Sequence, residues 1–204
     1  MIPDSYFDSF ETAKYSTRNP VQRLLIRRFM AKVISMFDAT VPHASVLELG
    51  CGEGFVSGQL SERQPGTSYV GVDANAGDIA NLRAKFPSVE AHEGSIYDLS
   101  FLDRTFDVVV CAEVLEHLDD PDAALKQITS VQPRWVILSV PHEPWFCLSN
   151  LARGKNVTRL GNDDDHVNLW GRGGIRKLVS RHFEIDRHET SYPWQILLAH
   201  PPTS

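Results

Sequence analysis

Four short apolar segments that alternate with helix-like stretches constrain the fold of this chain more than any other feature. The apolar segments are residues 45–49, 68–72, 106–110 and 135–140. Nearly continuous apolar runs of this length are typical of parallel strands that helices cover on both faces. The helix-like stretches between them are residues 55–63, 76–86 and 121–131. This alternation predicts an α/β fold with a doubly wound, mostly parallel sheet.

The segments at the two ends of the chain fit the same single domain, residues 1–204. Asn19-Pro20 places a capping residue before a first-turn proline, which predicts an amphipathic helix within an N-terminal helical extension, residues 1–40. One face of this helix is basic and is expected to face solvent; it carries Arg23, Arg27, Arg28 and Lys32.

A stretch after the fifth strand interrupts the alternating pattern. Residues 141–174 are rich in Asn, Asp, Gly and aromatic residues, and they predict a loop-rich insertion on the substrate side of the sheet. The sheet is then expected to be completed by a helix near 173–181 and strands near 183–189 and 193–199.

Composition argues against several classes of protein. The formal net charge of -6 disfavours a chain that binds mainly through nucleic-acid phosphates. The three cysteines form no C-x-x-C pair, which disfavours a disulfide framework or a zinc knuckle and favours a reducing, cytoplasmic setting. We expect neither a signal peptide nor a transmembrane segment, because no stretch approaches about 18 consecutive apolar residues.

A glycine-rich turn follows the first predicted strand and opens a helix. Gly50, Gly52 and Gly54 lie where the backbone must turn sharply and approach a ligand closely. The next strand ends at Asp73, which is placed to accept hydrogen bonds from both hydroxyls of a ribose. These features indicate a ligand that contains adenosine, which is common to NAD and S-adenosylmethionine.

The spacing of the glycines and the charges beside them separate these two ligands. The turn reads G-x-G-x-G rather than the G-x-G-x-x-G of dinucleotide sites, and Glu48 and Glu53 would repel a pyrophosphate. The pattern E-x-G-x-G-x-G resembles the first motif of the class I S-adenosylmethionine-dependent methyltransferases. The resemblance covers roughly residues 40 to 145 and is strongest with type 11 and quinone-biosynthesis O-methyltransferases.

The resemblance implies a Rossmann-like fold and S-adenosylmethionine as the cofactor. In this family the loop after the third strand covers the adenine, which here points to Ser95 and Ile96, and the end of the fourth strand lines the methionine part. The residues expected to bind the cofactor are Glu48, Gly50, Cys51, Gly52, Gly54, Asp73, Ala74, Ser95, Ile96, Cys111 and Glu113.

The sequence Glu113-x-x-Glu116-His117 offers two interpretations. On one helical turn these three side chains would share a face, and the pattern resembles the metal motif of quinone-biosynthesis O-methyltransferases and of small-RNA 2′-O-methyltransferases, with His166 as a possible fourth ligand. The alternative is that the glutamate and the histidine only organise the turn. We favour this structural interpretation and expect no metal.

The methyl acceptor is less well defined than the cofactor. His142, after the fifth strand, and His117 are the candidate general bases, which indicates methyl transfer to a hydroxyl oxygen of a small molecule. Two alternatives remain: an RNA 2′-O-methyltransferase, supported by Arg153, Lys155 and Arg159, and a cofactor-binding scaffold without turnover.

Overall fold

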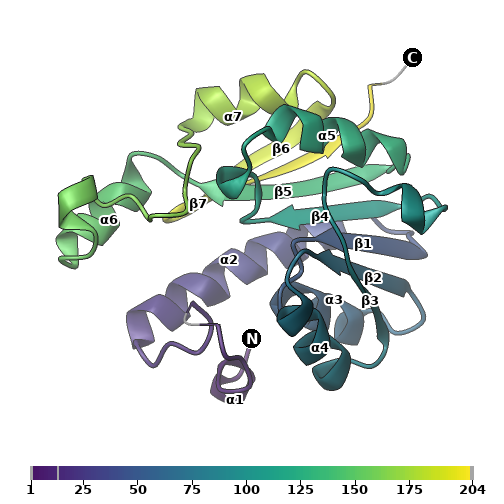
Figure 1. The fold of residues 1–204 in the computed structure, drawn as a ribbon, viewed down its shortest axis with the longest axis horizontal. Coiled ribbons are helices and arrows are strands. Elements are labelled where there is room, and N and C mark those ends of the chain that lie inside the picture. The colour runs from purple at the N-terminus through teal and green to yellow at the C-terminus, as the bar shows by residue number, and fades with distance from the viewer. Residues whose placement is uncertain (1, 13, 203–204) are drawn as a thin grey trace.

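The computed structural model describes residues 2–12 and 14–202 and is built on a seven-stranded sheet (Figure 1). The strands are β1 (Ser45–Leu49), β2 (Ser68–Asp73), β3 (Val89–Glu93), β4 (Val108–Ala112), β5 (Trp135–Pro141), β6 (Glu184–Ser191) and β7 (Trp194–His200). Their order is β3-β2-β1-β4-β5-β7-β6, and β7 runs antiparallel to both of its neighbours. The other pairings are parallel, which confirms the predicted doubly wound sheet.

Helices cover both faces of the sheet (Figure 1). The α-helices are α1 (Asp4–Phe7), α2 (Pro20–Asp38), α3 (Phe55–Arg63), α4 (Ala76–Lys85), α5 (Pro121–Ser130), α6 (Trp145–Ala152) and α7 (Arg172–Val179). Short 3-10 turns span Ser100–Leu102, Leu115–His117 and Val157–Arg159. One core cluster joins α2, α3 and α4 to one face, and a second joins α5 and α7 to the other. None of the helices in the described part of the chain is long and apolar enough to cross a membrane.

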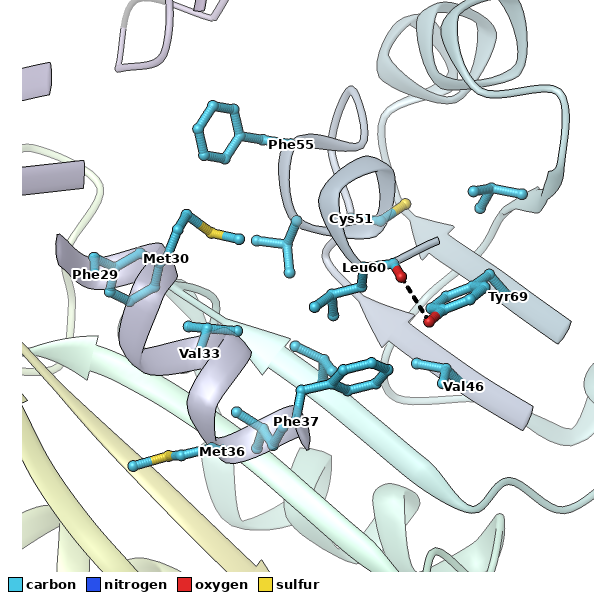
Figure 2. Close-up of a cluster of buried hydrophobic side chains, with 14 of the residues drawn as sticks. Phe29, Met30, Val33, Met36, Phe37, Val46, Cys51, Phe55, Leu60 and Tyr69 are labelled. Atoms are coloured by element: carbon cyan, nitrogen blue, oxygen red, sulfur yellow. Dashed lines mark hydrogen bonds between the residues drawn. The ribbon is translucent and has the colours of Figure 1, made fainter. Parts of the chain in front are cut away.

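The helix α2 begins as its sequence predicts. The side chain of Asn19 accepts hydrogen bonds from the amides of Val21 and Gln22, and Pro20 occupies the first turn. Figure 2 shows the apolar side of α2, with Phe29 and Phe37 among the side chains that form the core beside β1 and α3. In the same view, the Tyr69 hydroxyl donates to the Leu60 carbonyl oxygen at 2.9 Å.

The basic face of α2 is not wholly exposed, which corrects the sequence-based interpretation. Arg23 is buried and forms ion pairs with Asp4 and Asp8, and its guanidinium lies 5.2 Å from the centre of the Phe7 ring. The cause is the fold of the N-terminal segment, residues 2–12 and 14–19 among those described, which returns over α2. Lys32 forms an ion pair with Glu189 on β6.

Candidate functional site

The turn between β1 and α3 requires its glycines. Gly50, Gly52 and Gly54 have φ values of +69°, +50° and +87°, in the left-handed region that L side chains rarely adopt. A Cβ atom on Gly50 would lie 2.2 Å from Cγ2 of Val114, and the Gly50 amide donates to the Val72 carbonyl oxygen at 2.8 Å. The turn is therefore held tightly against β2 and the segment after β4.

A cavity of about 330 Å³ lies at the carboxyl ends of the central strands. Its lining includes six of the residues expected to bind the cofactor, namely Gly50, Asp73, Ala74, Ser95, Ile96 and Glu113. The carboxylate of Asp73 accepts hydrogen bonds from the amides of Gly52 and Asn75, each at 2.8 Å. These two bonds fix the orientation of the predicted ribose acid.

A larger cavity of about 880 Å³ adjoins the first. Gly50, Glu113 and His117 line both cavities. The walls of the larger cavity come from the N-terminal segment, α2, the glycine turn, α6 and the start of β7, and they include the predicted residues Glu48, Cys51 and Gly52. The site thus has a nucleoside-sized part and a second part that is large enough for an acceptor.

The two acidic residues of the glycine motif have different environments. Glu48 is buried and accepts a hydrogen bond from the Ser57 hydroxyl, and burial raises its pKa to about 8. Glu53 accepts from the amides of Glu11 at 3.0 Å and Thr12 at 2.6 Å, and it forms an ion pair with Lys85. Burial opposes ionisation of Glu53, but the hydrogen bonds from Lys85 and from residues 11 and 12 lower its pKa to about 2. The charge of Glu53 therefore holds the N-terminal segment.

The segment after β4 is not one helical turn, contrary to the expected common face. Glu113 has φ of +61°, and only Leu115–His117 form a 3-10 turn. The Glu113 carboxylate accepts from the Ser139 hydroxyl at 2.9 Å and pairs with Lys14 at 3.4 Å. A residue with left-handed backbone angles directs its side chain away from the turn that follows, so Glu113 does not share a helical face with the residues of that turn.

Glu116, His117 and His166 form a compact cluster beside Glu113. One ligand atom from each lies within 4.8 Å of the others, and all three residues line the larger cavity. Glu116 is buried, and neither of its carboxylate oxygens has a hydrogen-bond partner. Burial and the neighbouring Glu113 raise its pKa. Nε2 of His117 lies 4.0 Å from Oε1 of Glu116, too far for a hydrogen bond. A buried carboxylate without a hydrogen-bond partner is costly, so the fold needs a reason to retain it.

The structural interpretation does not supply that reason. The Asn168 side chain holds the turn instead, donating to the carbonyl oxygens of Leu118 at 2.6 Å and Leu115 at 3.4 Å. The Asn168 amide also donates to the Glu116 carbonyl oxygen at 3.0 Å. The side chain of Glu116 is therefore not needed to organise the turn.

Three of the predicted site residues lie outside both cavities. Cys111 is fully buried in the core beneath α5 and α7, and His142 lies near Arg172, where burial and the Arg172 charge lower its pKa. Successive side chains of a strand alternate between faces, so Cys111 points away from the cavities while Ala112, the next residue of β4, lines the larger one; His142 follows the end of β5 and lines neither cavity. Gly54 is the N-cap residue that precedes α3, and a Cβ there would meet Phe86 at 3.0 Å. The absence of a side chain at Gly54 thus lets α3 pack closely against Phe86 and Leu82.

Several wall residues were not identified from the sequence. Tyr97 and Val114 line the smaller cavity, and Lys14, Tyr15 and Trp194 line the larger one. Tyr97 and Val114 adjoin predicted residues and could have been found by extending the predicted loops. Lys14 and Tyr15 come from an N-terminal segment without periodicity, so no local pattern indicates that they approach the site.

Comparisons with known proteins agree with this geometry. The model of a methyltransferase domain family matches residues 21–182. A probable S-adenosylmethionine-dependent methyltransferase of Mycolicibacterium smegmatis is 36% identical over 75 residues, which are 37% of this chain and 28% of that protein. The ubiquinone biosynthesis O-methyltransferase of Hahella chejuensis is 33% identical over 92 residues, covering 43% of this chain and 38% of that protein. This chain thus spans less than half the length of either relative.

Solved structures share the fold. A protein from Pyrococcus horikoshii OT3 has a TM-score of 0.72 at 21% identity, with 97% of this chain and 99% of that chain covered. The magnesium protoporphyrin IX methyltransferase of Synechocystis PCC 6803, crystallised with S-adenosylhomocysteine, has a TM-score of 0.70 at 22% identity, with coverage of 91% and 89%. Because the family model covers most of the sequence, the chain belongs to the class I S-adenosylmethionine-dependent methyltransferases.

Proposed function

We propose that the protein transfers the methyl group of S-adenosylmethionine to a hydroxyl oxygen of a small molecule held in the larger cavity. The sulfonium methyl is already activated, so the protein must orient the acceptor and remove its proton. The observation that carries the proposal is the cluster of Glu116, His117 and His166 on the wall of the larger cavity, next to the junction with the smaller one.

We further propose that this cluster holds a divalent cation, which reverses our sequence-based preference. The partnerless oxygens of Glu116 and the unpaired Nδ1 of His166 are unused donors. Nδ1 of His117 lies 3.0 Å from the Asp165 carbonyl oxygen, a contact that would hold the proton on Nδ1 and leave Nε2 free to bind. Such a cation, bound to an acceptor hydroxyl, would lower the pKa of that hydroxyl. One carboxylate and two imidazoles suit Zn²⁺, Fe²⁺ or Mn²⁺ better than Mg²⁺.

The charge distribution supports a small acceptor over RNA. Lys155 pairs with Asp163 at 3.2 Å and Arg159 with Asp164 at 2.7 Å, so two of the three basic residues that would favour RNA are neutralised. The chain as a whole carries a net charge of -6. A continuous basic track for a phosphate backbone is not present among the residues that line the described cavities.

The test combines cation binding with the identity of the product. Thermal melts with EDTA, and then with added Mn²⁺, Zn²⁺ or Mg²⁺, should show a metal-specific rise in melting temperature for the wild type and none for Glu116→Gln. Glu184→Gln removes an exposed charge on β6 and should behave like the wild type. The enzyme is also given S-adenosylmethionine with a ¹³C-methyl group and a panel of phenols, catechols and aliphatic alcohols with matched amines.

Carbon-13 NMR of the products distinguishes O-methyl from N-methyl groups. We expect O-methyl products whose formation requires the cation and is lost in Glu116→Gln. Transfer to the amines would contradict the hydroxyl acceptor, and O-methylation that persists in EDTA would contradict the cation.

A further inference from the structure

Lys14 brings a positive charge to the junction of the two cavities. Its Nζ lies 3.4 Å from a carboxylate oxygen of Glu113, which lines both cavities, and 5.3 Å from the centre of the Trp194 ring. This ion pair is longer than the roughly 2.7–2.9 Å of a firm charge-assisted hydrogen bond. The Lys14 side chain is also 30% exposed, so its ammonium can engage a further partner.

The methionine part of the cofactor carries charges of both signs, and Lys14 is suited to bind the negative group. The methionine part carries a sulfonium, an α-ammonium and an α-carboxylate. The acidic residues near the junction, Glu48, Glu113 and Glu116, can accept hydrogen bonds from the α-ammonium but supply no positive charge for the carboxylate. Among the described residues, the lysines and arginines that line the larger cavity are Lys14, Arg153 and Lys155, and none lines the smaller cavity.

The other two cations belong to the wall that α6 and the loop after it form. Arg153 donates to the Ser149 carbonyl oxygen at 3.1 Å and to the Asn150 side chain, and Lys155 pairs with Asp163. These contacts hold both residues to α6 and the loop after it. Of these three lining cations, Lys14 is the one that contacts Glu113, which lines both cavities, and its neighbour Tyr15 packs on Phe55 directly after the glycine turn.

Two contacts anchor the segment that carries Lys14 to the glycine turn. The Tyr15 ring stacks on Phe55, the first residue of α3, with centroids 3.9 Å apart and planes at 5°. Glu53 accepts hydrogen bonds from the amides of Glu11 and Thr12. Glu53 belongs to the glycine motif and Phe55 follows it directly, so the position of Lys14 depends on that motif and the start of α3.

We infer that Lys14 binds the α-carboxylate of the cofactor's methionine part, exchanging its long contact with Glu113 for that group. Glu53 and Phe55 act as positioning residues, because they hold the segment 11–15 across the glycine turn. This inference rests on S-adenosylmethionine as the cofactor in the proposed function, but not on the acceptor or the cation.

The test removes the carboxylate from the ligand and the charge from the protein in turn. S-adenosylmethionine and its decarboxylated analogue, which lacks only that carboxylate, are titrated by calorimetry into the wild type and Lys14→Met. We expect Lys14→Met to raise the dissociation constant of S-adenosylmethionine about 10-fold or more, because a charged hydrogen bond is lost. The dissociation constant of the decarboxylated analogue should rise less than about 2-fold. Lys14→Arg should retain most of the affinity.

The controls separate this role from a structural one. Lys126→Met removes an exposed lysine of α5 and should leave both dissociation constants unchanged. Equal weakening of both ligands in Lys14→Met would show that Lys14 only holds the segment in place, and no weakening of either would exclude it from the site. Both results would overturn the inference. A wild type that binds neither ligand would instead contradict the proposed function.

Discussion

At the residue scale, Gly50 and Gly52 serve different purposes although both have positive φ. A Cβ on Gly50 would collide with Val114, whose side chain lines the smaller cavity. A Cβ on Gly52 would meet nothing within 4 Å and would point into open space beside the larger cavity. Gly50 is thus required by the fold, whereas Gly52 leaves room for a ligand.

This difference predicts opposite effects for two alanine variants. Gly50→Ala should lower the free energy of unfolding by about 3 kcal/mol or more, because steric overlap adds to the left-handed backbone cost. Gly52→Ala should lower the free energy of unfolding by only about 1–2 kcal/mol, but it should bind S-adenosylhomocysteine at least about 10-fold more weakly. Urea unfolding and calorimetry measure the two quantities.

Gly66→Ala is the matched control, since Gly66 also has positive φ and open space around it but lies outside both cavities. Gly66→Ala should lose about as much stability as Gly52→Ala and should bind S-adenosylhomocysteine with the affinity of the wild type. If Gly52→Ala binds as well as Gly66→Ala does, the open space beside Gly52 is not part of the cofactor site.

The part of the site that the sequence predicts follows from local backbone requirements. The glycine turn and Asp73 are identified by position at the ends of β1 and β2, and both line the cavities as expected. Cys111 and His142 were expected at the site but line neither cavity, because proximity to a strand end does not determine where a side chain points. The lack of a hydrogen-bond partner for the Glu116 carboxylate is equally invisible in sequence, since the turn that carries it is held by Asn168 from a distant loop and His166 comes from the same loop.

At the element scale, the N-terminal segment behaves as part of the site. Its aromatic residues Phe7 and Phe10 are buried against Phe55, and Glu53 binds the backbone of residues 11 and 12. The strand β3 shows a similar limit of sequence patterns: it reads Val-Glu-Ala-His-Glu, and only Val89 and Ala91 are buried. As an edge strand it lacks the apolar run by which the central strands were identified.

Glu53→Gln should loosen the N-terminal segment without unfolding the sheet. The variant loses the ion pair with Lys85 and weakens the bonds to Glu11 and Thr12, so hydrogen exchange at pH 7 should be faster at those two amides and unchanged in β1 and β4. Glu62→Gln, an exposed change on α3, is the control. Faster exchange throughout the sheet would mean that Glu53 supports the whole fold.

The same variant has a predicted pH dependence. The pKa of Glu53 in the folded protein is about 2, below its ordinary value of 4.5, so its stabilisation is fully present above about pH 4.5 and is lost as pH falls toward 2. The wild type should therefore lose its stability advantage over Glu53→Gln across this acidic range. A stability difference that stays constant from pH 7 to pH 3 would contradict the assignment.

At the scale of the whole molecule, the site lies where the order of the sheet reverses. β1 and β4 are neighbours, and the chain leaves them toward opposite edges of the sheet, which opens a crevice at their carboxyl ends. The strand–helix alternation predicts this topology because connections in such sheets are short and right-handed. The insertion with α6 and the N-terminal segment then enclose the crevice, and both are joined to it by long-range contacts that no local pattern encodes.

A ligand that bridges these parts should stabilise the molecule as a unit. At a free concentration 100 times its dissociation constant, S-adenosylhomocysteine contributes about 2.7 kcal/mol, which for a domain of this size raises the melting temperature by about 5–10 °C. A tenfold higher concentration should add about half as much again, whereas NAD should give no shift, because the G-x-G-x-G turn lacks the G-x-G-x-x-G spacing that binds a pyrophosphate. Asp73→Ala, compared with its own ligand-free melt, should show a smaller shift, since the variant loses the predicted acceptor for the ribose hydroxyls. A shift with NAD equal to that with S-adenosylhomocysteine, or an Asp73→Ala variant that responds like the wild type, would place the ligand elsewhere than in the cavity at the ends of β1 and β2.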